Sequence, residues 1–173
     1  KGAIFAHGRQ MGKTLILPVR WNLATAKPVL GTNPTEKLLT NGIRGSLKYS
    51  DFEWCSWADN DSVSFTIDLL KLEMLNTLIL GCITNNGMAI HKPASVRVEV
   101  SDDNSKFREA VVQSFTSEEI FREGNFIENL SLKLGGTQAR YVRVTAKGPG
   151  VCPASHVRPG QTSRIFFDEV MLE

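Results

Sequence analysis

The sequence has few cysteines, little net charge and no long hydrophobic run. No apolar run approaches the ~18 residues that a membrane span needs, so we expect none. The formal net charge is only +2, and basic residues alternate with acidic ones, which argues against nucleic acid as a partner. Cys55, Cys82 and Cys152 are an odd number without a Cys-x-x-Cys pair, so we expect buried small hydrophobes with at most one bridge.

The first 20 residues lack the signals of a complete domain. Residues 3–6 and 14–17 read as two short strands, and two strands do not form a stable domain alone. The chain starts at Lys1 without an initiator methionine or an apolar leader, which we expect of a piece cut from a longer protein. We therefore predict the tail of a preceding small β domain over residues 1–20 and a second domain over residues 21–173.

Period-2 alternation runs through the second domain. Val63, Phe65 and Ile67 share one face of a predicted strand, with polar residues between them. The same pattern returns in residues 78–82, 96–100, 130–134 and 142–144, and turn-forming residues separate these segments. Helix is expected only in short pieces over residues 34–39 and 117–121. The predicted fold class is all-β, an antiparallel β-sandwich of the jelly-roll type.

Several segments carry a family resemblance. The discoidin, or coagulation factor 5/8 type C, domain, which includes family 32-like carbohydrate-binding modules, has segments that this sequence resembles. The similar segments are residues 22–29, 38–42, 64–69, 95–103 and 139–144. The resemblance implies a galactose-binding-like sandwich that presents loops to sugars, lipids or proteins and that is rarely an enzyme.

A narrower resemblance lies in residues 33–40, residues 150–153 and His156. These are similar to C-terminal modules of glycoside hydrolase family 20 β-N-acetylhexosaminidases, or chitobiases, from gut Bacteroidetes. The resemblance implies a non-catalytic accessory module that binds N-acetylhexosamine- or galactose-containing glycans beside an upstream catalytic domain. It also implies a periplasmic or extracellular, outer-membrane-associated location in a Gram-negative bacterium. The alternatives are a structural spacer that binds no glycan and a protein or lipid adhesion module.

The resemblance also implies a structural calcium ion, held by oxygens of a turn and of a glutamate near the C-terminus. Here these positions are Asn41, Ser46, Asp51 and Glu169, with Asn41 in the place of the usual aspartate. The alternative is that Asn41 and Gly42 form a tight turn and that Glu169 is a charge at the rim.

Sugar recognition needs an apolar face for the ring and planar polar groups for its hydroxyls. Trp54 and Trp57 are three apart and so point to opposite faces of an extended strand, and we expect Trp54 to be the exposed platform. The alternative is that Trp54, like Trp57, packs in the core.

Two loops supply candidate polar groups. The first contains Asn85, Asn86 and His91, and its alternative interpretation is an ordinary Asn-Gly turn. The second, over residues 148–163, leads to a further set of candidates, namely His156, Arg158 and Arg164. Solvated arginines are the alternative there, and Cys152 with His156 offers too few ligands for zinc.

No catalytic arrangement is readable. Glycoside hydrolysis needs two carboxylates across a cleft. The adjacent pairs lie in turns or on strands, where neighbouring side chains are expected to point to opposite faces; they are Asp102–Asp103, Glu118–Glu119 and Asp168–Glu169. The three histidines have no local Ser or Asp partner, so we expect this chain not to be an enzyme.

Overall fold

Antiparallel strands make up almost all the regular structure in the computed structural model, which describes residues 5–6, 9–10, 21–23, 38–58 and 62–173. The strands are β1 (Phe5–Ala6), β2 (Arg9–Gln10), β3 (Trp21–Leu23), β4 (Cys55–Ala58), β5 (Ser62–Asn85), β6 (Ser95–Ser101), β7 (Arg108–Ser114), β8 (Asn125–Lys147) and β9 (Arg164–Leu172). The described helical turns are η1 (Leu38–Thr40), η2 (Asn86–Met88) and α1 (Ser117–Ile120). The expected all-β class is confirmed.

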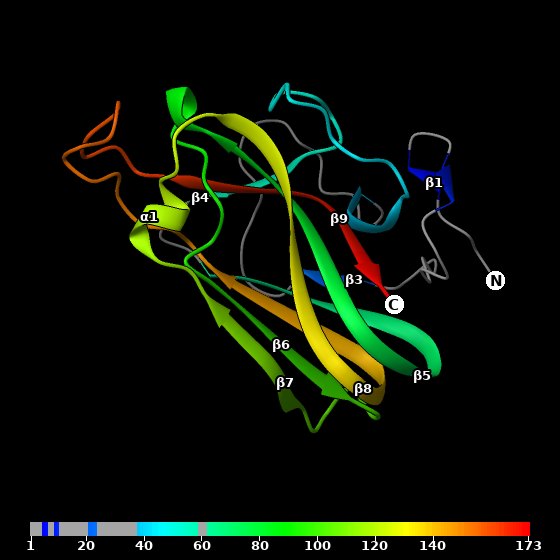
Figure 1. Ribbon diagram of the computed structural model, residues 1–173. Coiled ribbons are helices and arrows are strands. Elements are labelled where there is room, and N and C mark those ends of the chain that lie inside the picture. The colour runs from blue at the N-terminus through cyan, green and yellow to red at the C-terminus, as the bar shows by residue number, and fades with distance from the viewer. Residues whose placement is uncertain (1–4, 7–8, 11–20, 24–37, 59–61) are drawn as a thin grey trace.

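Two long bent strands, β5 and β8, connect the layers of the sandwich. They pair from Ser62 with Lys147 to Asn85 with Asn125, and the register shifts between Asp68 and Glu73. A second shift lies between Leu75 and Thr77. Leu70 at the first shift and Gly135 and Gly136 opposite the second have positive φ angles, and both ribbons curve strongly in Figure 1. Bulges and glycines of this kind let a sheet fold over on itself.

Each half of the bent pair has its own neighbours. The first half of β5 pairs with β3, and the last part of β8 pairs with β6, which continues to β7. The second half of β5 pairs with β9, which continues to β4. β1 and β2 form a separate two-stranded sheet. The proposed boundary between residues 20 and 21 stays a prediction.

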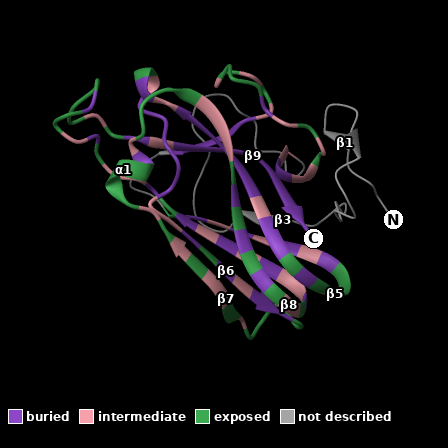
Figure 2. Ribbon diagram, viewed as in Figure 1, coloured by how far each residue is buried: buried purple, intermediate pink, exposed green. Residues whose placement is uncertain are grey.

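The core lies between these layers, and its inner side chains alternate along the strands as predicted. Val63, Phe65 and Ile67 are all buried, together with Trp57 from β4 and Phe167 from β9. Figure 2 shows buried and less buried positions alternating along the strands. Burial of each large apolar side chain contributes roughly 1.5–3 kcal/mol, so these strands supply most of the stability of the fold.

The helix α1 confirms the prediction over residues 117–121. The Thr116 side chain accepts the Glu119 backbone N–H, and the Glu119 carboxylate accepts the Thr116 backbone N–H, at 3.2 and 2.7 Å. This capping box satisfies two donors at the helix start. The other expected helix appears only as η1, and residues 34–37 lie outside the described residues. Because α1 ends directly before Phe121, it positions that ring.

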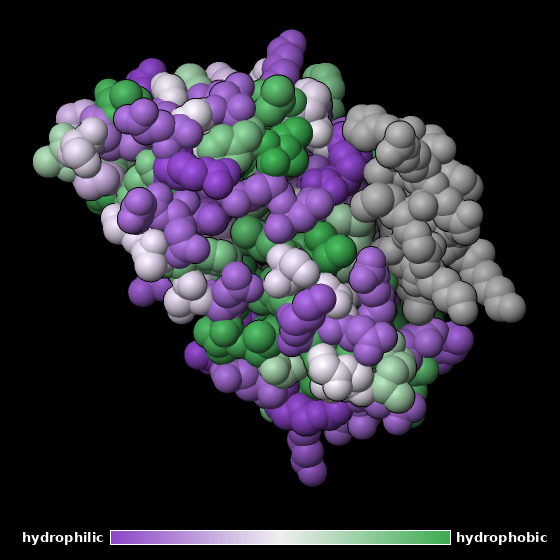
Figure 3. All heavy atoms as spheres, in the orientation of Figure 1, coloured by the Kyte–Doolittle hydropathy of each residue, from purple (hydrophilic) through white to green (hydrophobic). Residues whose placement is uncertain are grey.

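On the face drawn in Figure 3, hydrophobic residues form small groups interrupted by hydrophilic ones. None of the helices in the described ranges has the length and apolar character needed to cross a membrane.

Candidate functional site

Two loop regions hold buried polar side chains. The first, the acidic bulge, consists of Arg44 from the loop over residues 41–45 and of Asp168 and Glu169, which lie under that loop. The second, the loop pocket, is lined by residues from three segments: Asn86, Phe121, Glu123, Pro153, Ser155, His156 and Val157.

The acidic bulge arises from one extra residue in β9. Leu80 pairs with Val170 and Cys82 with Phe167, so three steps of β9 oppose two steps of β5. The extra residue brings Asp168 and Glu169 under the same loop. The Gly45 N–H donates to Asp168 at 2.9 Å, and the Gly42 N–H donates to Glu169 at 3.1 Å. The expectation that this adjacent pair points to opposite faces is wrong here, because a bulge breaks the period of two.

Asp168 forms a buried ion pair. Its Oδ2 lies 2.7 Å from Arg44 Nε, and Arg44 also donates to the Asn129 amide oxygen at 2.8 Å. Burial raises the pKa of Asp168, while the Arg44 charge and the backbone donors of Gly45 and Glu169 act in the opposite direction. At Gly81 a Cβ atom would collide with the Asp168 carboxylate and the Arg44 guanidinium. The ion pair therefore requires glycine at position 81.

Glu169 is the unpaired member of the acidic bulge. Its side chain is fully buried, and its Oε1 atom has no hydrogen-bond partner among the described residues. Burial, helped by the nearby Asp168 and Glu53 charges, raises the pKa of Glu169 to about 8, against the opposing effects of the Gly42 N–H and the Arg44 charge. A buried carboxylate with a free oxygen is suited to a cation.

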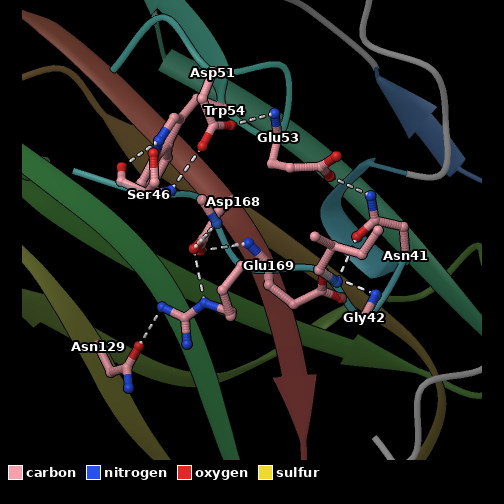
Figure 4. A network of polar contacts seen from close by, with 12 residues as sticks. Asn41, Gly42, Ser46, Asp51, Glu53, Trp54, Asn129, Asp168 and Glu169 are labelled. Atoms are coloured by element: carbon pink, nitrogen blue, oxygen red, sulfur yellow. Dashed lines mark hydrogen bonds and ion pairs between the residues drawn. The ribbon is translucent and has the colours of Figure 1, made fainter. Parts of the chain in front are cut away.

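The structure brings together only part of the predicted calcium set. Asn41 lies beside Gly42, accepts the Ile43 N–H at 2.7 Å and donates to Glu53 Oε2 at 2.6 Å. Asn41 and Glu169 thus meet at Gly42, and Glu53 joins them (Figure 4). Glu53 was missed because nothing in the sequence shows how the loop folds back.

Ser46 and Asp51 belong to a different part of this loop. The Asp51 carboxylate accepts the backbone N–H groups of Ser46 and Glu53, at 2.9 and 2.8 Å. These hydrogen bonds lower the pKa of Asp51, although burial acts against them. Figure 4 places Ser46 and Asp51 at the other end of the network from Glu169. Their joint membership of one cation site with Asn41 and Glu169 stays a prediction, and in this structure both carboxylate oxygens of Asp51 accept backbone N–H groups of the loop.

Trp54 is not the exposed platform that the sequence predicts. Its side chain is 0 % exposed, and it packs with Ile83, Ile90 and Phe166. The indole N–H donates to the Ser46 carbonyl at 2.9 Å. The expected opposite orientation of Trp54 and Trp57 is correct, since Trp57 packs in the other core cluster. Both faces of this layer are covered, so neither tryptophan can stack on a sugar.

The loop pocket forms where two distant loops meet. In the first, Asn85 and Ile90 exchange backbone hydrogen bonds around η2, and the His91 N–H donates to the Arg164 carbonyl at 3.0 Å. In the second, the Cys152 N–H donates to the Gln161 carbonyl at 2.9 Å. The resulting pocket has a volume of about 150 Å³. Pockets for drug-sized ligands measure roughly 300–1,000 Å³, so this one suits a single small polar unit.

Asn86 and His156, one candidate from each of the two loops, meet in this pocket. Asn86 Nδ2 lies 3.2 Å from His156 Nε2, and the Arg158 backbone N–H donates to His156 Nδ1 at 3.0 Å. Because Nδ1 accepts the Arg158 N–H, the neutral form of this imidazole carries its single proton on Nε2. Turning the Asn86 amide by half a rotation brings its otherwise unpartnered Oδ1 toward that N–H.

The other predicted sugar ligands are placed less favourably. His91 is fully buried, which corrects the expectation that it reaches sugar hydroxyls. Burial lowers the pKa of His91 to about 4, with His156 adding to this effect. The Arg158 guanidinium bonds Gln161 at 3.4 Å, and Arg164 opens β9. Asn85 is half-buried in its turn.

Five pocket residues were missed, namely Phe121, Glu123, Pro153, Ser155 and Val157. A signal for the first two existed, because the capping box at Thr116 and Glu119 predicts a helix that ends at Phe121. What the sequence does not reveal is that this helix lies against the loop over residues 148–163. The half-buried Phe121 contributes an apolar ring, while Glu123 and Ser155 contribute oxygens.

The loops on a rigid antiparallel sandwich define a binding module. The F5/8 type C domain model matches residues 24–157, and the chain belongs to this family. F5/8 type C domains of this kind are non-catalytic modules, so the expectation that the chain is not itself an enzyme is confirmed. No curated protein sequence matches the chain.

Similar solved structures share the fold. One is a family 32 carbohydrate-binding module from Clostridium perfringens, in complex with GalNAc-β-1,3-galactose (TM-score 0.55, 15% identity, 89% of this chain and 94% of that one). Another is the C-terminal domain of a chitobiase from Bacteroides fragilis (0.53, 16%, 93% and 97%). A third is a fucose binding module from Streptococcus pneumoniae (0.55, 16%, 93% and 97%).

Proposed function

We propose that the chain is a glycan-binding module whose loop pocket holds one terminal sugar unit. The carrying observation is the meeting of Asn86 and His156 in a pocket of about 150 Å³ that also offers a ring face from Phe121. Amide, imidazole and hydroxyl groups suit sugar hydroxyls, and an aromatic ring suits the apolar face of a pyranose. Support also comes from the sugar complex of the C. perfringens module.

The proposal extends to the sugar that is bound, the parent enzyme and the cellular location. The sugar is an N-acetylhexosamine or galactose at a glycan end, and the module serves an upstream β-N-acetylhexosaminidase in the periplasm or outside the cell. The likeness to the chitobiase domain supports this context.

The test is a glycan array followed by NMR titration with N-acetylglucosamine, N-acetylgalactosamine and galactose. We expect shifts at the loop pocket, and we expect Asn86→Ala to weaken binding at least about tenfold, since a buried hydrogen bond to a ligand is lost. Asn76→Ala is the matched control, because Asn76 is exposed at the bend of β5, away from the pocket. A folded domain that binds no glycan would favour the spacer function instead.

A structural calcium ion is a separate part of the proposal. Asn41 and Glu169, with Glu53, would hold the ion, and its charge would stabilise the buried carboxylate and close the loop over residues 41–54. We expect calcium to raise the melting temperature of wild type and to have no effect on Glu169→Gln. An equal rise in both proteins would place the ion elsewhere.

A further inference from the structure

Three side chains with metal-binding atoms meet beside the loop pocket. His91 comes from the segment before β6, and Cys152 and His156 come from the loop over residues 148–163. All three are buried, and their ligand atoms lie within 4.8 Å of one another. The His91 and His156 rings are in edge contact, with centroids 4.9 Å apart.

His91 is the least satisfied polar group of this cluster. Its side chain is 0 % exposed, and neither ring nitrogen makes a hydrogen bond of ordinary geometry among the described residues. The Ile120 backbone is the one hydrogen-bonding group that acts on the pKa of His91, and its effect is smaller than those of burial and of His156. Leaving a buried donor or acceptor unpaired costs roughly 1–3 kcal/mol. Flipping the ring by half a turn would only exchange the two nitrogens, and both are in the same situation. A metal ion would engage the lone pair of one nitrogen.

The other two ligands are available with small changes. Cys152 is a free thiol whose Sγ lies 3.4 Å from Ser163 Oγ. His156 would exchange one of its two contacts, to Asn86 or to the Arg158 N–H, for the metal. Ligand atoms around a tetrahedral zinc ion lie about 3.3–3.8 Å apart. The ligand atoms here lie up to 4.8 Å from one another, so the three side chains would have to move by on the order of 1 Å to bind zinc.

We propose that His91, Cys152 and His156 bind a zinc ion. One thiolate and two imidazoles are the donors that zinc prefers, and hard cations such as calcium disfavour them. Three protein ligands leave a fourth position for water, and the pocket lined by His156 gives a path for entry. The ion would tie the loop before β6 to the loop over residues 148–163. Zinc binding at this cluster would not depend on sugar binding.

The test uses Co²⁺ as a spectroscopic probe and Zn²⁺ as a competitor. Metal-free, reduced protein is titrated with Co²⁺, and we expect one equivalent to produce a sulfur-to-cobalt charge-transfer band that Zn²⁺ abolishes. Cys152→Ser should remove the band, while Cys55→Ala should retain it, since Cys55 is buried in the main core. His156→Gln, which keeps Cys152, should weaken binding at least about 100-fold.

The outcomes separate the proposal from its alternatives. Native mass spectrometry should show one zinc ion per chain, and circular dichroism of the metal-free variants checks that they fold. Absence of a stoichiometric ion in folded wild type overturns the proposal, and so does a band that survives Cys152→Ser. Binding that is lost in Glu169→Gln but kept in Cys152→Ser and His156→Gln would assign the ion to the acidic bulge, against the proposal.

Discussion

The acidic bulge and the cluster of His91, Cys152 and His156 each bury a titratable side chain without a full set of partners. The two regions differ in the chemistry of that side chain. Burial raises the pKa of Glu169 to about 8 and lowers that of His91 to about 4. Low polarity disfavours the charged form in both cases, so an acid and a base shift in opposite directions. The bulge offers oxygen donors that suit a hard cation, whereas the loops offer nitrogen and sulfur that suit a softer one.

The comparison also shows how one region is stabilised internally. Asp168 has Arg44 as its counter-charge, but the described residues provide no comparable partner for Glu169 or His91. The bulge is therefore a structural element with one free ligand atom. In the cluster of His91, Cys152 and His156, only His91 lacks a hydrogen bond of ordinary geometry among the described residues, since His156 and Cys152 have polar contacts. Four experiments sharpen this difference.

The largest effect is expected from Arg44→Met, which leaves the buried Asp168 carboxylate unpaired. Breaking a buried ion pair from one side costs about 3–5 kcal/mol in the free energy of unfolding. Arg97→Met is the control, because the Arg97–Glu109 pair is about half exposed, at 56% and 55%, and should cost less than about 1 kcal/mol. Denaturant unfolding measures both, and equal losses would show that the Arg44 pair has no special role.

Gly81→Ala should destabilise the same region by about 3 kcal/mol, since the new Cβ meets the Asp168 and Arg44 side chains. Gly87→Ala is the matched control. At Gly87 a Cβ would meet only the Asn85 side-chain oxygen at 3.5 Å, and no positive φ stands in the way. If Gly81→Ala unfolds at the same denaturant concentration as wild type, the close approach at the bulge is not important for stability.

The pH dependence of Glu169→Gln tests the acidic bulge in chelator. A raised pKa means that the folded state keeps a proton that the unfolded state loses above pH 4.5. The associated stability is present below pH 4.5 and is lost as the pH rises through about 8. Glu169→Gln should therefore become more stable relative to wild type as the pH rises through this window. Excess calcium should reverse the trend, and a flat difference in chelator would contradict the raised pKa.

His91 should show the opposite sign and a smaller effect. Its folded pKa of about 4 lies below the usual 6.5, so the unfolded state takes up a proton first as the pH falls. Stability is full above pH 6.5 and declines as the pH falls through this window. The NMR titration of the His91 ring in metal-free protein measures this directly. A midpoint near 6.5 would mean that the ring is accessible to water.

The strands and the short helix were predictable because their signals are local. Alternation in β5 and the capping box at Thr116 each depend on residues a few positions apart. The errors at Trp54 and His91 have one cause, since a polar or amphipathic residue in a loop looks exposed until another segment covers it. The sequence did not suggest His91 as a third ligand beside Cys152 and His156 for a related reason, because His91 lies 61 positions before Cys152 in the chain.

The sequence by itself determined the β class, the inward faces of the strands and the family resemblance, because hydrophobic alternation acts over a few residues. Tertiary structure alone decided which loops meet, that a bulge places Asp168 and Glu169 under one loop, and that Asn86 reaches His156. Those features depend on strand register and on loop packing between segments far apart in the chain. Such contacts arise only when the bent sheet closes, so no local pattern encodes them.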